Sequence, residues 1–329
     1  MTGGTISPIR NIVVSGRGVT LSVAKHPMRK VIKLPNLPIR KADAHKGDYG
    51  RVLVLAGSVG MTGAACMCGE AVLRGGAGLV TLGIPEGLYP IAASRVSLAV
   101  MTRPLPETRQ KTLSYKARWA INELAQGFDV LALGPGLSRN QDTQELVLWI
   151  LENIPLPMVV DADALNAVST RPSVLNKVQR DCIVTPHPGE MARLLGGSTA
   201  GVWASADEVQ KDRRGAVEEF LKRYPALILV LKGHKTLVAD GQLLFINTTG
   251  NPGMATAGTG DVLTGLIAGL LAQGIKTPAV LPPFEAAQLG VYLHGLAGDL
   301  AAAEKGETSL IATDVLDKLP EAFRAYLKK

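Results

Sequence analysis

The stretch Arg51-Val-Leu-Val-Leu-Ala-Gly-Ser-Val-Gly60, together with the helix and strand predicted after it, decides the fold. The apolar run 51–56 predicts a strand that is buried on both faces, and the following Gly57–Gly60 predicts a loop. Small residues from Gly63 to Arg74 predict a helix, and Gly78-Leu-Val-Thr-Leu-Gly83 predicts the next strand. This order is typical of a parallel sheet that is covered by helices.

The same alternation continues along the chain. Further buried strands are predicted at 129–133, 157–160, 182–184 and 226–231, each separated from the next by helical segments. A hairpin is predicted from 236–239 and 242–246 around Asp240-Gly241. We therefore expect one α/β domain over residues 43–329, with a mainly parallel sheet between two layers of helices.

The composition favours a compact globular protein. Of the 329 residues, 47% are hydrophobic and 19% are charged, whereas aromatic residues make up only 4%. Few aromatic side chains argue against stacking platforms for single-stranded nucleic acid. The net charge of +7 is confined to residues 1–46, which hold nine Lys or Arg and one acid, Asp43. The remaining chain is close to neutral, so the basicity does not predict nucleic-acid binding.

Residues 1–42 are expected to form a basic arm without stable structure, and we have no functional account of it. Met28 offers an alternative start, and the first 30 residues lack the apolar core of a secretory signal. No apolar run is long enough to cross a membrane. Three cysteines cannot form a disulfide framework, so a reducing cytoplasm is expected.

A glycine-rich loop, Asn251-Pro-Gly-Met-Ala-Thr-Ala-Gly-Thr-Gly-Asp261, runs directly into an apolar helical segment. Unpaired N–H groups at a helix start favour phosphate oxygens, and Gly258 and Gly260 allow the backbone to approach an anion closely. Asp261 would lie beside that anion, where its carboxylate could act as a base. The alternative is an Asp that caps the helix behind a flexible loop.

Nearly every other polar motif follows a predicted strand. In an open α/β sheet, ligands bind beyond the carboxyl ends of the strands, so we expect these motifs to converge on one crevice. The motifs are Gly57–Gly60, Gly134-Pro-Gly136, Asp161 with Asp163, Thr185-Pro-His-Pro-Gly-Glu190, and Lys232-Gly-His-Lys-Thr236.

Two of these motifs carry carboxylates. Asp161 and Asp163, two apart at a strand end, are expected on the same face, where they could hold Mg²⁺ through waters or cap the next helix. His187 lies between two prolines, which favours contact with a ligand over a place in the core. Glu190 is expected either to cap the helix or to bind water on a metal.

The remaining polar residues favour two different roles. The segment 232–236 places cations and a hydroxyl where nucleotide phosphates or ribose could bind, or else forms a solvated turn. His294 and Asp299 lie in a helix of small and apolar residues, which favours structural roles.

Taken together, the motifs resemble the ADP/ATP-dependent NAD(P)H-hydrate dehydratase family of the ribokinase-like superfamily. The resemblance runs in order over about residues 43–323. It rests on these motifs together with Lys46-Gly-Asp-Tyr-Gly50, Gly75-Gly-Ala-Gly-Leu-Val80, Asp161-Ala-Asp-Ala-Leu-Asn166, Tyr292-Leu-His-Gly295 and Ala312-Thr-Asp314.

The resemblance implies repair of hydrated nicotinamide cofactors. The S epimer of NADHX or NADPHX would be dehydrated while ADP or ATP is hydrolysed, with Mg²⁺ bridging the nucleotide phosphates. Asp261 would take the proton of the C6 hydroxyl, and the N–H groups of Gly258, Thr259 and Gly260 would stabilise the transferred phosphoryl group.

The family likeness also assigns binding residues. The adenine nucleotide would contact Lys232, Gly233, His234, Lys235, Thr236 and Gly260. The hydrated cofactor would contact Ala65, Gly136, His187 and Asp261. Water on Mg²⁺ would be held by Glu190, with Asp161 or Asp163 as further candidates. A homotetramer, and a separate epimerase that supplies the S form, are implied in the same way.

Two alternatives stay open at this stage. A ribokinase-like kinase for a vitamin-precursor alcohol would share the glycine-rich cradle, but would show Asn where this chain has His187. A non-catalytic nucleotide-binding protein would not need the carboxylate of Asp261. Residues 1–42 are too short for the epimerase domain fused to many relatives, so no epimerase activity is expected. The sequence does not distinguish ADP from ATP, or NADHX from NADPHX.

Overall fold

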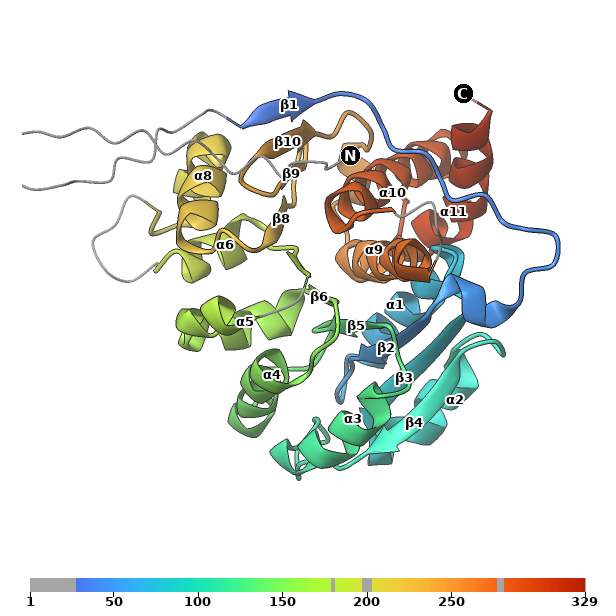
Figure 1. Cartoon of the computed structure of the whole chain (residues 1–329), viewed down its shortest axis with the longest axis vertical. Helices are drawn as coiled ribbons and strands as arrows, with labels where there is room; N and C mark the ends of the chain where they lie inside the picture. Colours follow the sequence, from blue (N-terminus) through green and yellow to red (C-terminus); the bar gives the residue numbers. More distant parts are fainter. Residues whose placement is uncertain (1–27, 179–180, 197–202, 277–280, 329) are drawn as a thin grey trace, which may run out of the picture.

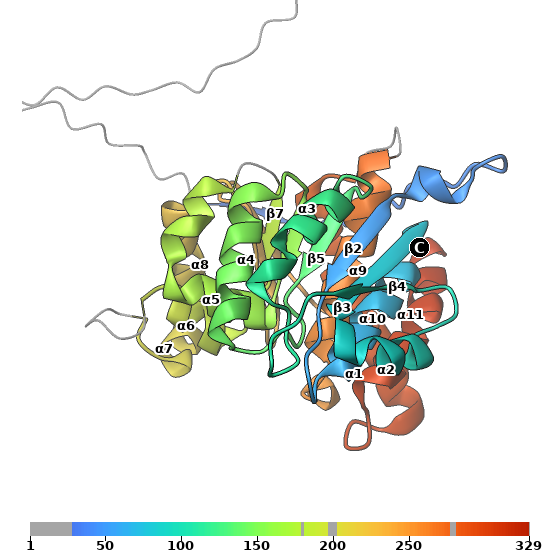
Figure 2. The ribbon, with the colours of Figure 1, turned by 90° about the horizontal axis from the view of Figure 1, so that it is seen from below.

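The computed structural model describes residues 28–178, 181–196, 203–276 and 281–328. A single sheet runs through the middle of the molecule, with helices on both sides (Figures 1 and 2). Its strands are β1 (Arg29–Val31), β2 (Arg51–Leu55), β3 (Leu79–Pro85), β4 (Met101–Leu105), β5 (Val130–Leu133), β6 (Met158–Val160), β7 (Cys182–Val184), β8 (Ile228–Leu231), β9 (Leu237–Ala239) and β10 (Leu243–Ile246). Their order across the sheet is β1-β10-β9-β8-β7-β6-β5-β2-β3-β4.

The helices divide between the two faces of the sheet. One face is covered by α1 (Thr62–Arg74), α2 (Tyr89–Arg95), α9 (Thr259–Lys276), α10 (Pro283–Lys305) and α11 (Ala312–Leu327). The other is covered by α3 (Arg118–Ala125), α4 (Gln141–Asn153), α5 (Ala162–Thr170), α6 (Pro188–Leu194), α7 (Ala206–Lys211) and α8 (Arg213–Arg223). None of the described helices is both long enough and apolar enough to span a bilayer.

Alternation of side chains along β2 explains why both faces need a helical layer. Val52 and Val54 pack into the core beneath α1 and α9, whereas Leu53 and Leu55 pack into the core beneath α3 and α4. Successive side chains of a strand point to opposite faces, so an uninterrupted apolar strand is stable only when both faces are covered. The expected three-layer α/β/α architecture is confirmed.

The predicted strands and hairpin are present, but two strands were missed. Among the described strands β9 is antiparallel to its neighbours β8 and β10, and the other adjacent pairs are parallel. The edge strand β4 contains Arg103 and Pro104 and is largely exposed, so it shows no apolar run. The short strand β1 was missed for the same reason, because two of its three residues are basic.

The N-terminal boundary differs from the expected one. Residues 28–42 were assigned to the arm, yet β1 pairs in parallel with β10, and Gln288 Nε2 donates a hydrogen bond to the carbonyl of Lys33 at 2.9 Å. The backbone groups along the edge of β10 find partners in this segment, which runs along the molecule in blue in Figure 1. The described structure therefore includes residues 28–42, which the expected boundary at residue 43 placed in the arm. Residues 1–27 lie outside the described residues.

The strand order creates one place where the polar strand ends can meet. From β2 the chain proceeds outward to β3 and β4, then returns to β5 on the other side of β2 and continues to β8. Such a reversal opens a crevice at the carboxyl edge of a parallel sheet. Helix α9 packs against α1, α10 and α11 and crosses β5 and β6. Its first turn lies at this edge.

Candidate active site

A buried ion pair anchors the crevice. Lys232, just after β8, places its Nζ 2.5 Å from Oδ1 of Asp161, which follows β6. The hydroxyl of Thr264 on α9 donates to the other oxygen of Asp161 at 2.7 Å. Asp161 is only 1% exposed, and its two oxygens both have partners. Together, the ion pair and the hydrogen bond of Thr264 connect α9 to the ends of β6 and β8. They join residues that are far apart in the sequence.

Asp261 lies in the first turn of α9, close to these charges. Burial, followed by the nearby Asp161 carboxylate, raises the pKa of its carboxyl from the ordinary 3.8 to about 7, although Lys232 acts in the opposite direction. A carboxyl with a pKa near 7 is well matched to proton transfer at neutral pH. Burial of an acid beside like charges is a common feature of catalytic sites.

The loop before α9 needs glycine at two positions for different reasons. Gly258 has φ of +97°, and a Cβ there would lie 2.5 Å from the Cε of Met67. Gly260 is different, because a Cβ there would lie 3.5 Å from Nζ of Lys232, at ordinary contact distance. Nothing in the described protein crowds Gly260. Its missing side chain instead leaves the helix start open to a ligand.

A set of hydrogen bonds fixes the conformation of the same loop. The hydroxyl of Thr259 donates to the carbonyls of Met254 (3.1 Å) and Thr256 (2.9 Å). Nε2 of His294 lies 2.9 Å from the carbonyl of Thr259 and must carry the proton there. Burial lowers the pKa of His294 to about 4, so the ring is neutral. The structural role expected for His294 is confirmed.

Asp299 also supports the loop, as expected. Its carboxylate accepts hydrogen bonds from the backbone N–H of Gly250 and from Nδ2 of Asn251, both at 3.0 Å. The glycine-rich segment is thus tied to α10 near both of its ends. A cradle held in this way loses little entropy when an anion binds.

His187 and Glu190 form a reciprocal cap at the start of α6. Nδ1 of His187 accepts the backbone N–H of Gly189 at 3.0 Å, and Oε2 of Glu190 accepts the N–H of His187 at 2.8 Å. Burial lowers the pKa of His187, with Lys232 and Arg193 as further causes, which suits a neutral ring that accepts at Nδ1. Burial raises the pKa of Glu190 to about 7. The capping alternative for Glu190 is confirmed, and the half-exposed His187 ring faces the crevice edge.

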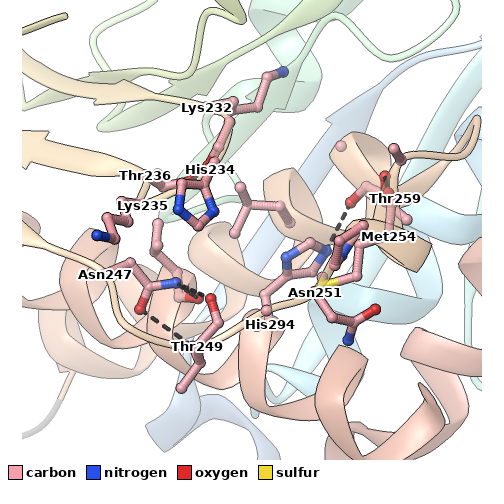
Figure 3. A pocket seen from close by; sticks show the side chains of 18 of the residues that line it. Lys232, His234, Lys235, Thr236, Asn247, Thr249, Asn251, Met254, Thr259 and His294 are labelled. Atoms are coloured by element: carbon pink, nitrogen blue, oxygen red, sulfur yellow. Dashed lines mark hydrogen bonds between the residues drawn. The ribbon is translucent and has the colours of Figure 1, made fainter. Parts of the chain in front are cut away.

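A pocket of about 670 Å³ opens beside the cradle (Figure 3). Its lining contains the whole predicted nucleotide-binding set: Lys232, Gly233, His234, Lys235, Thr236 and Gly260. Figure 3 shows the side chain of Lys232 extending away from the other labelled pocket residues, in keeping with its bond to Asp161.

Sequence reasoning missed part of this pocket. Asn247, Thr249, Leu263 and Val291 also line it. Asn247 and Thr249 come directly after β10, which runs in the same direction as β8, so the rule applied to the other strand ends would have found them. No motif marks Leu263 or Val291, because apolar residues of a helix look alike in the sequence whether they face a core or a pocket.

Asp163 does not share the surroundings of Asp161. Ala162 between them has φ of +50°, so the alternation of an extended strand does not extend across the pair. The carboxylate of Asp163 accepts from the N–H of Ser138 at 2.8 Å and from Nδ2 of Asn166 at 3.0 Å. These bonds occupy both oxygens of Asp163.

Two of the residues expected to contact the hydrated cofactor are buried. Ala65 on α1 is fully buried, and Gly136 is buried with its carbonyl accepting the hydroxyl of Ser58 at 2.8 Å. Their contact with the cofactor stays a prediction. In the described part of the chain, no group of three or more His, Cys, Asp or Glu residues could hold a metal ion by itself.

A family model described as NAD(P)H-hydrate dehydratase matches residues 52–321 of this chain. The chain belongs to the NAD(P)H-hydrate dehydratase family. The ADP-dependent (S)-NAD(P)H-hydrate dehydratase of Neisseria meningitidis is 36% identical over 284 residues, which cover 85% of this chain and 86% of that protein. The bifunctional NAD(P)H-hydrate repair enzyme of Moorella thermoacetica is 48% identical over 290 residues, or 88% of this chain and 52% of the relative.

The fold of this NAD(P)H-hydrate dehydratase family member agrees with a solved relative. The ADP/ATP-dependent NAD(P)H-hydrate dehydratase from Bacillus subtilis, co-crystallised with ATP and Mg²⁺, superposes with a TM-score of 0.71 at 31% identity. The match covers 88% of this chain and 94% of that one. The chain spans about half the length of the bifunctional relatives it matches. The family inferred from the motifs is confirmed.

Proposed function

We propose that this protein dehydrates the S epimer of NADHX or NADPHX to NADH or NADPH, and couples this reaction to hydrolysis of ADP or ATP. The observation that carries the proposal is Asp261, a carboxyl with a pKa of about 7 in the first turn of α9 beside an open glycine cradle. Family membership supports the substrate class, and the pocket beside the cradle supports a nucleotide co-substrate.

In the proposed reaction, Asp261 accepts the proton of the C6 hydroxyl, and that oxygen attacks the terminal phosphoryl group of the nucleotide. The bond between this phosphoryl group and the rest of the nucleotide breaks, leaving AMP from ADP or ADP from ATP. Phosphate then departs with the C6 oxygen, and loss of the C5 proton restores the double bond of the dihydropyridine. The hydroxyl is a poor leaving group, and phosphorylation makes it a good one.

The helix start provides the electrostatic part of this chemistry. In this proposal the backbone N–H groups of Gly258, Thr259 and Gly260 bind the phosphoryl oxygens. Residues 232–236 would hold the rest of the nucleotide in the adjoining pocket. The ammonium of Lys232 pairs with Asp161, so its proposed part is to orient the backbone there and to balance the buried carboxylates rather than to bind phosphate directly.

Arg213 supports the same nucleotide loop. Its guanidinium donates to the carbonyls of Leu231 (2.8 Å) and Lys232 (3.1 Å), where β8 ends. These bonds fix the path of the chain into the pocket. We propose Arg213 as a positioning residue for nucleotide binding.

Mg²⁺ fits this site only through water and nucleotide phosphates. The described residues offer no three-ligand group, and Asp161 and Asp163 use their oxygens on protein donors. Glu190 is buried at the crevice and has lone pairs left after accepting from His187, so it is the best placed to bind metal-bound water. Mg²⁺ commonly keeps several waters beside substrate phosphates, and it would neutralise their charge.

The hydrated cofactor would bind on the side of the crevice formed by α1, the loop after β5 and the start of α6. His187, Gly136 and Ala65 lie in these three segments. A cytoplasmic location, a homotetramer and cooperation with an NAD(P)HX epimerase belong to the same proposal. The names of the bifunctional relatives support the pairing of two repair activities.

One assay tests the proposal directly. Purified protein is mixed with hydrated NADH, MgCl₂ and either ADP or ATP, and the absorbance band of reduced nicotinamide is followed alongside phosphate release. We expect NADH and phosphate to appear in equal amounts. Nucleotide hydrolysis without NADH, or phosphorylation of a thiazole or pyrimidine alcohol in its place, would contradict the proposed function.

A further inference from the structure

Two arginines from different segments meet at one amide near the crevice. Arg193 on α6 donates through NH2 to Oδ1 of Asn166 at 2.8 Å, and Arg139 donates to the same oxygen at 3.5 Å. Arg139 follows the loop after β5, and Asn166 lies on α5. Three segments thus bring two positive charges onto a single neutral acceptor.

Most guanidinium N–H groups of Arg139 and Arg193 have no hydrogen-bond partner in the described part of the chain. Each guanidinium carries five N–H donors, but the bonds to Asn166 are the ones found for Arg139 and Arg193 within the described residues. Neither arginine forms an ion pair with a described acid. Nε of Arg193 is buried and unpartnered, which is costly for a polar group unless a ligand completes it. The arrangement is typical of a site that awaits an anion.

Asn166 is held firmly in the orientation that brings the arginines together. Its Nδ2 donates to Oδ1 of Asp163 at 3.0 Å, and the other oxygen of Asp163 accepts from the N–H of Ser138 at 2.8 Å. The amide oxygen therefore faces the guanidinium groups. Asp163 is itself satisfied by these bonds and does not pair with either arginine.

The arginine pair lies on the side of the crevice away from the nucleotide pocket. A Cβ at Gly189 would lie 3.8 Å from NH1 of Arg193 and 3.0 Å from Cε1 of His187, so Arg193 is close to the ring expected to contact the cofactor. No residue of α5 or α6 lines the described nucleotide pocket. An anion at this place would therefore lie outside the described nucleotide pocket.

We propose that Arg139 and Arg193 bind the pyrophosphate of the hydrated dinucleotide. This inference rests on the proposed function and adds a binding subsite to it. The pyrophosphate is one ribose away from the nicotinamide ring, whereas the 2′-phosphate of NADPHX is attached to the far ribose. The pair lies beside His187 and, through Asn166, beside Asp163; Lys232 and Asp161 act on the His187 ring, and Asp163 acts on Asp261. The nearer phosphates fit this place, and both NADHX and NADPHX carry them.

The test uses Arg139→Gln, Arg193→Gln and the double variant, with Arg214→Gln as the matched control. Arg214 pairs with Glu218 on the outer surface of α8, away from the crevice. Losing a charged hydrogen-bond donor should raise KM for hydrated NADH and hydrated NADPH about tenfold or more for each single variant. KM for ADP and kcat should change less than about twofold, because the nucleotide pocket and Asp261 are untouched.

The outcomes distinguish a pyrophosphate subsite from a 2′-phosphate subsite and from a purely structural role of the two arginines. A rise in KM for hydrated NADPH alone would assign the arginines to the 2′-phosphate and overturn the pyrophosphate assignment. Unchanged KM for both substrates, or a change for ADP alone, would overturn the inference while leaving the proposed function intact. Arg139 is exposed, so its variant tests the subsite even if Arg193→Gln lowers the melting temperature.

A binding measurement covers the case in which wild-type protein shows no dehydration. Inorganic pyrophosphate is then titrated into wild-type protein and the double variant in a calorimeter without metal. Binding that is lost in the double variant, but kept in Arg214→Gln, supports the anion site by itself. Equal binding by all three proteins, or binding by none, refutes it.

Discussion

Replacing Asp261 by Asn should abolish dehydration and yet stabilise the folded protein above neutral pH. Burial, together with the neighbouring carboxylate of Asp161, raises the pKa of Asp261 from 3.8 to about 7. The folded protein therefore binds this proton more tightly than the unfolded chain does. As a result, the free energy of unfolding falls as the pH rises from about 4 to about 7. Asn carries no charge and avoids this loss.

The size of the effect follows from the pKa difference. Each pKa unit corresponds to about 1.36 kcal/mol, so the rise at Asp261 sets a ceiling of about 4 kcal/mol. Because Asp261 is partly exposed, solvent screening reduces the expected gain at pH 8 to about 1–2 kcal/mol. Near pH 4 the acid is protonated in the folded state and partly protonated in the unfolded chain, so most of the gain should disappear. Urea unfolding of both proteins at several pH values measures it.

Asp163→Asn is the matched control. Its carboxylate accepts two hydrogen bonds from protein donors, so removing a charged acceptor there should cost about 1–3 kcal/mol. Destabilisation by Asp261→Asn at pH 8 would refute the argument that folding disfavours the ionised form of this carboxyl group. An equal gain at pH 4 and pH 8 would also refute it, because the effect would then not come from ionisation.

The other two predictions concern the glycine-rich loop before α9 and the decrease of kcat/KM at acid pH. Gly260→Ala should melt near the wild-type temperature but lose about a hundredfold or more in kcat, because the new Cβ fills the place of the phosphoryl group. Gly258→Ala, with φ of +97° and Met67 in contact, should instead lower stability by about 1–3 kcal/mol; equal effects of the two variants would contradict this distinction. The kcat/KM should fall as the pH drops below about 7, because Asp261 must be ionised to act as a base. Glu190→Gln should show the same fall in kcat/KM at acid pH. Loss of this fall in the variant would assign the titration to Glu190.

The positions of most strands, the hairpin and the crevice could be predicted from local patterns. Apolar runs such as 51–56 and 228–231 mark strands buried on both faces, and the residues after them necessarily gather at one edge of a parallel sheet. The strands β1 and β4 could not be predicted in this way, because an edge strand such as 101–105 is exposed and carries charge and proline. Their pairing depends on the neighbouring strand rather than on their own composition.

The sequence alone determined the family, the α/β/α architecture and the residues gathered at the site, because each depends on short motifs in a fixed order. Only the tertiary structure decided which charged side chains pair with one another. It paired Lys232 with Asp161 and placed Asp163 against Ser138 and Asn166, and it left Arg139 and Arg193 without an ion pair among the described residues. Burial, distance and charge balance arise when segments far apart in the chain come together. No local pattern of residues encodes them.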